Sequence, residues 1–360
     1  MNRTAVWTAA LLALVVWLAA GPPSFSQGES LLPQDAQDSL AGSATRMKPE
    51  TGRASLDKRY TILPGTRPAE VLADFTANEP SDTSGAPNTN TDTVLNEHIV
   101  RWIGTLAGQK GFEGWKRAKW TVAPLGPGTH GWIVLLTDNG RETGYLIVSA
   151  AENGTLQLIE YGTGEHPLFS TRTLYRTLVQ HAIIPTSMSY QAWLDSAETR
   201  LRRLYTDAFH AVWTVPAGNN RILVDAKTGE IRTFQNYSPA SDSGLLGLHG
   251  AAFEHTPGTP IEVAPSDPYE EIAWLTRKAL PIRSYEELTP YLATGKSLTF
   301  VCECFGGRLT LPLPVTGALR WIGGAAFIAF EQEGRRFVLL DEAVSLGQFY
   351  PTDGISSSFP

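Results

Sequence analysis

The pattern of apolar and polar positions divides the chain into three stretches of different character. Residues 5–20 form one uncharged apolar run, and residues 27–92 are rich in Ser, Thr, Pro, Ala, Gly and Asp. From about Thr93 onward, apolar residues recur at the spacings of helices and strands. A segment poor in large apolar residues cannot bury enough surface to offset its loss of chain entropy. We therefore expect residues 27–92 to be a disordered linker that precedes the folded part.

The folded part opens with a helix pattern followed by strand patterns. Apolar residues at helical spacing precede Gly108, and these are Leu95, Ile99, Trp102, Ile103 and Leu106. Strand-like runs follow at 115–123, 131–138, 144–150 and 155–161, separated by Gly-Pro-Gly and Asn-Gly turn sequences. This order predicts one helix and an antiparallel meander.

A second unit repeats this order. Apolar residues from Tyr190 to Tyr205 form one helical stripe, which predicts a single helix there. Strand-like runs follow at 208–215, 221–225 and 230–234. The string AKWTV at 118–122 is echoed by AVWTV at 211–215, and each copy follows an expected helix. The two units together predict tandem α+β modules over residues 93–236.

Two short strings carry a resemblance to a known family. The string VDAKTGE at 224–230 resembles the closing hairpin of PepSY-like domains, with Asp225 and Thr228 bonding the turn and Gly229 in a left-handed conformation. The string GYLIVSA at 144–150, with Ile159-Glu160-Tyr161, is similar to prodomains of secreted papain-like bacterial peptidases. The resemblance covers about residues 93–236 and implies inhibitory, chaperoning or protein-binding modules. No peptidase motif follows, which departs from the order expected of a peptidase precursor.

The residues after a joint at 237–265 predict a second α+β domain over 266–360. Asp267-Pro268 is a helix-start sequence and predicts a helix that runs towards Lys278. Ser284 begins another capping box, and either Pro290 kinks that helix or the helix starts again at Thr289-Pro290. Strand-like runs follow at 297–304, 308–313, 326–331 and 336–341. The whole chain thus predicts an α+β protein built from helix-plus-antiparallel-meander modules and a further α+β domain.

The apolar run at 5–20 indicates export from the cytoplasm. It follows Arg3, ends at Gly21-Pro22-Pro23, and is shorter than the roughly 20 residues that span a bilayer. A signal peptide over 1–26 and an uncleaved N-terminal anchor both fit. In either case we expect an extracytoplasmic protein that meets the membrane only through this segment. The formal net charge of −7 argues against nucleic acid as a partner.

The sequence contains no complete catalytic motif. No histidine lies in H-E-x-x-H, no G-x-S-x-G occurs, and the G-x-G-x-x-G at 126–131 precedes a strand pattern instead of a helix. We therefore assign no catalytic, cofactor-binding or metal-binding residue and expect no cofactor.

The pair Cys302 and Cys304 is the most distinctive chemical feature. On a strand both side chains share one face while Glu303 takes the other. Their Cα atoms would lie about 6.6 Å apart, at the outer limit for a disulfide. A strained redox-active disulfide, a structural disulfide, two buried thiols and a metal-binding pair are all open at this point.

These observations favour a non-enzymatic, extracytoplasmic protein-binding module. Its expected partner is an envelope or secreted protein, with a peptidase as one candidate class, bound by strand addition at an exposed sheet edge. One alternative is a thiol-redox protein that uses Cys302 and Cys304. A second alternative is a structural component of the cell surface.

Overall fold

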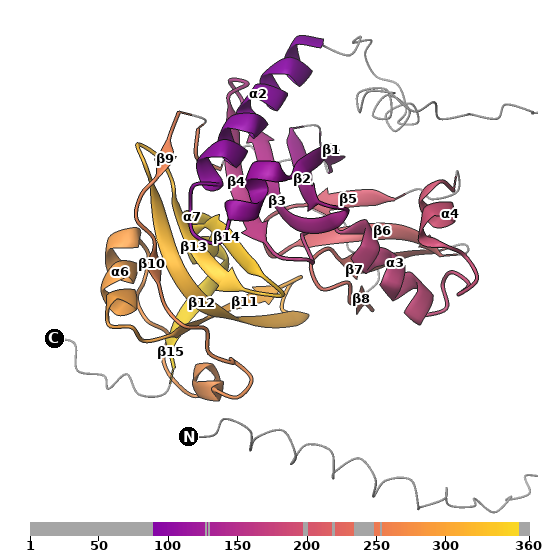
Figure 1. The fold of residues 1–360 in the computed structure, drawn as a ribbon. Coiled ribbons are helices and arrows are strands. Elements are labelled where there is room, and N and C mark those ends of the chain that lie inside the picture. The colour runs from indigo at the N-terminus through magenta and orange to yellow at the C-terminus, as the bar shows by residue number, and fades with distance from the viewer. Residues whose placement is uncertain are drawn as a thin grey trace, which may run out of the picture. The chain divides into compact units, whose positions relative to one another are not determined.

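The fold is α+β, with every pair of named strands antiparallel (Figure 1). The computed structural model describes residues 89–126, 128, 130–196, 201–217, 220–233, 248–252 and 254–352. The expected signal or anchor at 1–26 and nearly all of the expected linker lie outside these residues. Within the described part, every helix is too short or too polar to cross a bilayer. The predicted fold class is confirmed at this level, and the tandem PepSY-like arrangement stays a prediction.

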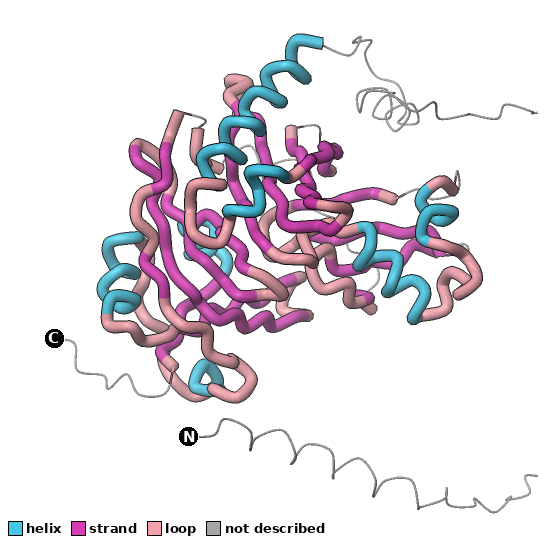
Figure 2. Tube along the Cα trace, viewed as in Figure 1, coloured by secondary structure: helices cyan, strands magenta, loops and turns pink. Residues whose placement is uncertain are grey.

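The first predicted unit forms largely as the sequence indicates, but the strand expected at 115–123 begins only at Lys119, because residues 113–117 form a 3-10 turn that buries Trp115. Helix α2 (Thr89–Leu106) lies against the sheet and buries its apolar stripe, which comprises Leu95, Ile99, Trp102, Ile103 and Leu106 (Figure 2). A 3-10 turn η1 (Glu113–Arg117) leads into the meander β1 (Lys119–Leu125), β2 (Gly131–Asp138), β3 (Arg141–Ala150) and β4 (Leu156–Thr163). Asn139 and Gly140 join β2 to β3 with φ values of 51° and 78°. That pair of positive φ values explains why the turn sequence is Asn-Gly.

The meander continues directly into strands from the C-terminal third of the chain. Strand β4 pairs with β14 (Arg335–Leu339), and the stacked rings of Tyr161 and Phe337 cross this seam with centroids 4.7 Å apart. The sheet then proceeds through β13 (Ala326–Glu331), β12 (Leu309–Ile322), β11 (Leu298–Cys304) and β15 (Gly347–Pro351). Two short strands, β9 (Thr256–Pro257) and β10 (Ile261–Glu262), also pair with β12. One eleven-stranded sheet therefore contains strands from both sides of the joint expected at 237–265, and from the joint itself.

A second, four-stranded sheet lies between these parts in sequence. It comprises β5 (Arg202–Tyr205), β6 (Ala211–Ala217), β7 (Asn220–Asp225) and β8 (Ile231–Arg232), with helices α3 (Thr171–Gln180) and α4 (Tyr190–Leu194) beside it (Figure 1). The prediction of one helix from Tyr190 to Tyr205 was wrong. The helix ends at Leu194, and Arg202–Tyr205 is a strand because its residues pair with β6. The spacing of apolar residues along the chain gives no sign of this pairing.

The turn between β7 and β8 has the local chemistry predicted for it. The Asp225 carboxylate accepts the N–H groups of Lys227 at 2.9 Å and Thr228 at 2.8 Å, and Gly229 has a φ of 76°. The buried Lys227 Nζ donates to the carbonyl oxygen of His166 and, at 3.1 Å, to that of Glu333. Burial, followed by the charge of Arg336, lowers the pKa of Lys227 to about 8. This lysine therefore links the small sheet by hydrogen bonds to the turn between β13 and β14.

The C-terminal helices differ from those predicted. Helix α6 (Tyr285–Ala293) begins at Ser284, whose hydroxyl accepts the Glu287 N–H at 3.3 Å, and it contains Pro290. The predicted helix from Asp267 to Lys278 was wrong, because only the 3-10 turn η2 (Ile272–Leu275) forms there. The turn buries Ala273 alone, so a longer helix would have no apolar face to cover. Helix α7 (Leu340–Leu346) follows β14, where the sequence indicated the end of a strand.

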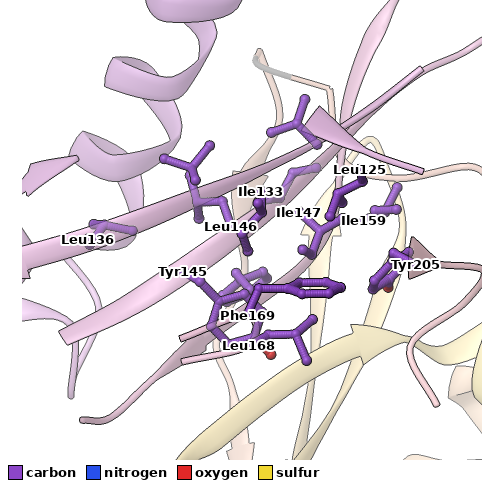
Figure 3. Packing of buried hydrophobic residues seen from close by; sticks show 14 of the residues in the cluster. Leu125, Ile133, Leu136, Tyr145, Leu146, Ile147, Ile159, Leu168, Phe169 and Tyr205 are labelled. Atoms are coloured by element: carbon purple, nitrogen blue, oxygen red, sulfur yellow. The ribbon is translucent and has the colours of Figure 1, made fainter. Parts of the chain in front are cut away.

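A buried ion pair lies within the large sheet and is hydrogen-bonded to the small one. The carboxylate of Glu160 in β4 lies 2.8 Å from Arg336 Nη2 in β14, with the two side chains 0% and 2% exposed. Tyr145 in β3 and Tyr205 in β5 both donate their hydroxyls to the same carboxylate. Figure 3 shows both tyrosine rings among the leucine and isoleucine side chains of the core. Arg336 also donates to the Ala208 carbonyl at 2.6 Å, so one carboxylate and one guanidinium connect β3, β4, β5 and β14.

A second buried carboxylate lacks such compensation. Glu342 in α7 accepts the Ala208 N–H at 3.3 Å through Oε1, while its Oε2 has no hydrogen-bond partner in the described part of the chain. Burial, followed by the negative charges of Asp207 and Glu160, raises the pKa of Glu342 well above its ordinary value. The folded protein therefore favours the neutral form of this side chain.

Replacing Arg336 by Met is expected to lower the free energy of unfolding by about 3–5 kcal/mol, because it leaves the Glu160 charge buried without a cation. Urea unfolding followed by circular dichroism measures this. The double variant Glu160→Gln, Arg336→Met should lose less than the single one. The control is Arg320→Met, which breaks the exposed pair with Glu286 and should cost less than about 1 kcal/mol. Equal losses for Arg336→Met and Arg320→Met would contradict the role given to the buried pair.

Replacing Glu342 by Gln is expected to stabilise the protein at neutral pH by about 1–3 kcal/mol. Because the pKa of Glu342 is raised on folding, its favourable contribution is complete below its unfolded value near 4.5 and is lost as the pH rises through the folded value. Urea unfolding of both proteins between about pH 4 and about pH 8 should show the difference grow with pH. A difference independent of pH would show that Glu342 does not titrate in this way.

Candidate binding surface

The two cysteines lie in the hydrophobic core. Cys302 and Cys304 in β11 are free thiols with 1% and 0% of their surface exposed, and Glu303 between them faces solvent. A hydrogen bond with Cys302, together with burial, raises the pKa of Cys304. A thiol with a raised pKa carries little thiolate, so it is a poor nucleophile and a poor metal ligand.

The structure also brings a histidine and an aspartate to this strand. His210 Nδ1 lies 2.8 Å from Asp207 Oδ2, and His210 Nε2 accepts the N–H of Phe305, the residue after Cys304, at 2.8 Å. The sequence contained no sign of this neighbourhood, because the two segments are far apart in the chain. A ring that donates to a carboxylate and accepts from a backbone N–H has no lone pair left for a thiol proton. The arrangement therefore holds the chain in place and does not activate Cys304.

No other chemical cluster in the described part points to catalysis. Among those residues, no group of three or more His, Cys, Asp or Glu side chains is placed to hold a metal ion. The polar groups around Glu160 are enclosed and bonded to one another, so they offer no site to a substrate.

The surface instead presents a compact apolar feature at η2. Tyr269, Ile272 and Leu275 are exposed by 69%, 52% and 61%, and we call these three side chains the apolar knob. They are three residues apart, and η2 is a 3-10 helix with three residues per turn. Ile272 and Leu275 therefore lie on the same side of η2, and Tyr269 lies in the loop three residues before it.

Hydrogen bonds within the loop hold the knob in shape. The Asp267 carboxylate accepts the Tyr269 N–H at 2.8 Å, and the Asp267 carbonyl accepts the Glu271 N–H at 2.8 Å. Trp274 Nε1 donates to the Pro268 carbonyl at 2.7 Å. The knob is therefore ordered before any partner arrives, which reduces the entropy cost of binding.

A groove adjoins the knob. It has a volume of about 520 Å³ and runs between Tyr269, the β7–β8 turn and the first residues of β12. Its apolar lining includes four prolines, namely Pro265, Pro268, Pro312 and Pro314. Three carboxylates and one guanidinium also line it, from Glu230, Asp267, Glu331 and Arg232.

A second hollow of about 640 Å³ lies beside α6 and β12, and it is less suited to binding. Two of its three charged residues, Arg320 and Glu286, pair with each other at 2.5 Å, and the third is Asp341. The Arg320 guanidinium also lies 4.4 Å from the centre of the Tyr285 ring. A ligand there would have to displace contacts that already satisfy one another.

Comparisons with known proteins do not assign this chain to a family. No family model, no curated protein and no solved structure matches it. The PepSY-like resemblance over 93–236 therefore remains a prediction.

Sequence reasoning missed the knob because it placed Tyr269, Ile272 and Leu275 in a helix. A signal was present in their spacing, since three apolar residues at intervals of three match the period of a 3-10 helix. A buried α-helical face would show a mixture of intervals of three and four.

The core position of the two thiols makes a definite prediction. In the folded full chain, a maleimide should label neither Cys302 nor Cys304 within minutes, because both are shielded from solvent. After denaturation it should label both, and prior treatment with a reductant should change neither result. Mass spectrometry of the labelled protein gives the count. A thiol count that rises after reduction would support the thiol-redox alternative instead.

Proposed function

We propose that this protein is a non-enzymatic, extracytoplasmic protein-binding module that holds its partner at the apolar knob and the adjoining groove. The knob is the observation that carries this proposal. The described part of the chain exposes six large apolar side chains, and three of them lie in this one loop. Clustered apolar exposure of this kind is typical of interaction sites, whereas single exposed residues are ordinary.

The size and order of the knob suit a binding hot spot. Burying a large apolar side chain contributes about 1.5–3 kcal/mol, so three such side chains supply a useful part of a binding free energy. Hot spots commonly consist of a few large side chains that fill pockets on the partner. The internal hydrogen bonds of the loop keep these side chains in position.

The chemistry of the rest of the protein supports a non-enzymatic role. The groups that resemble catalytic residues are committed to structure, including the thiols in β11, the bonded ring of His210 and the enclosed carboxylate of Glu160. The apolar run at 5–20 supports the extracytoplasmic location. The PepSY-like resemblance adds a secreted or envelope protein as the kind of partner, with a peptidase as one class.

Photo-crosslinking tests this proposal. A photoreactive amino acid placed at Ile272 of the full chain, in its native host, is expected to yield a discrete crosslinked protein. The matched control is Ile322, which is 67% exposed and lies in β12 away from the knob. Adding Tyr269→Ser and Leu275→Ser should reduce the crosslinked product at least about fivefold, because each removes apolar contact area.

Two results would overturn the proposal. One is the absence of any discrete product at position 272. The other is the same product, in similar yield, from positions 272 and 322.

A further inference from the structure

We infer that the groove beside the knob binds an extended segment of the partner that carries apolar side chains next to a lysine or arginine. This inference rests on the proposed function and specifies the chemistry of the partner. Three observations carry it: the edge of β12 to which the main-chain N–H and C=O groups point, the prolines on that edge, and the carboxylates around the groove.

The ladder around β11 fixes the direction of its main-chain groups. The Leu280 N–H donates to the Phe349 carbonyl at 2.7 Å, so the main-chain groups of Phe349 face away from β11. Phe349 is paired with Phe300, and in an antiparallel pair both residues bond to each other or neither does. The N–H and C=O of Phe300 therefore face β12.

The same alternation then assigns both edges of β12. Phe300 is paired with Leu313, so the main chain of Leu313 faces β11. Its neighbours Pro312 and Pro314 must face the opposite edge, together with Thr310. This agrees with the general placement of proline, whose missing N–H is tolerated on an unpaired edge.

Among the described residues, no strand covers this edge at Thr310 and Pro312. The pairing of β12 with β13 ends at Val315 and Phe330. Because Val315 faces β11, it exchanges no hydrogen bond with Phe330, and by the same alternation the Pro314 carbonyl faces the Glu331 N–H of β13. Thr310, Pro312 and Pro314 all line the groove. Thr310 and Pro312 present two carbonyl groups there but one N–H, because proline has none.

This composition disfavours strand addition at this edge and favours a cation. An added strand needs alternating donors and acceptors, and Pro312 removes one of the two donors. An edge rich in acceptors instead suits a group that has donors alone, which describes a lysine ammonium or an arginine guanidinium.

The side chains around the groove reinforce this preference. Arg232 is already paired with Asp225 at 2.6 Å and Glu230 at 2.9 Å, and it is 10% exposed. The carboxylates of Glu230, Asp267 and Glu331 outnumber it, and one oxygen of Glu331 accepts the Gly334 N–H. The basic residues that follow the knob, Arg277 and Lys278, do not line the groove. The lining therefore has a net negative charge, which a cationic segment complements.

The apolar lining of the groove explains why we expect apolar side chains in the partner segment. Leu309, Leu311 and Leu313 line the groove with the prolines, and the exposed ring of Tyr269 stands beside them. Apolar side chains of the partner would cover these residues and the knob together. The volume is within the range of sites that enclose a few side chains.

A peptide selection tests this inference. The probe is a displayed library of random dodecapeptides, selected against the immobilised full chain. We expect enrichment of peptides in which apolar residues flank a lysine or arginine. For a selected peptide, fluorescence polarisation should show about threefold to tenfold weaker binding to the Glu230→Gln, Glu331→Gln variant, and weaker binding as salt is raised. Circular dichroism confirms that this variant is folded.

A matched control separates the groove from general charge. Glu286→Gln removes one surface carboxylate, against two in the groove variant, and it should leave the affinity unchanged because it lies in the second hollow. Replacing the lysine or arginine of the peptide by alanine should weaken binding to the wild type and have much less effect on the Glu230→Gln, Glu331→Gln variant.

The outcomes are distinguishable from those of the crosslinking experiment. Selected peptides that lack basic residues, no selected peptides at all, or equal weakening by Glu286→Gln would each overturn this inference. If position 272 still crosslinks a discrete protein, the proposed function stands without it. If the discrete product proves to be a second copy of this chain, the groove is a self-association surface and the inference fails.

Discussion

The ion pair between Glu160 and Arg336 is the constraint on which the arrangement of the molecule depends. Two charges removed from water must be compensated by each other and by hydrogen bonds, since an unpaired buried charge is costly. The hydroxyls of Tyr145 and Tyr205 and the carbonyl of Ala208 provide the remaining hydrogen bonds. Because these partners come from both sheets, the pair can be satisfied only when the two sheets are correctly placed.

The need to satisfy buried polar groups also explains which side chains lie in the core and which lie on the surface. Lys227 and the two cysteines are buried and His210 is half-buried, and each of them is committed to the packing of distant segments. The apolar side chains of the knob are instead exposed to water, although the protein buries many other apolar side chains in its core. The buried polar groups and the exposed apolar groups together support the proposed binding role.

The sequence predicted those elements whose apolar spacing matched their burial. Helix α2 and the strands β1 to β4 follow the pattern of buried and exposed positions, and the turn at Asp225–Gly229 follows from its residues. The prediction was wrong at Arg202–Tyr205 and at η2. In both places a short apolar pattern was compatible with more than one element, and pairing with β6 or the absence of a surface to cover decided between them.

By itself the sequence determined the α+β class, the local turns and the location of Cys302 and Cys304 on one strand face. Only the tertiary structure decided that β4 pairs with β14, that His210 lies beside the cysteine strand and that the knob and the proline edge meet at one groove. The spacing of apolar residues indicates which positions of a helix or strand are buried and which are exposed. The partners of a sheet edge or a buried charge come from distant parts of the chain, and nothing in local spacing specifies which of them will meet.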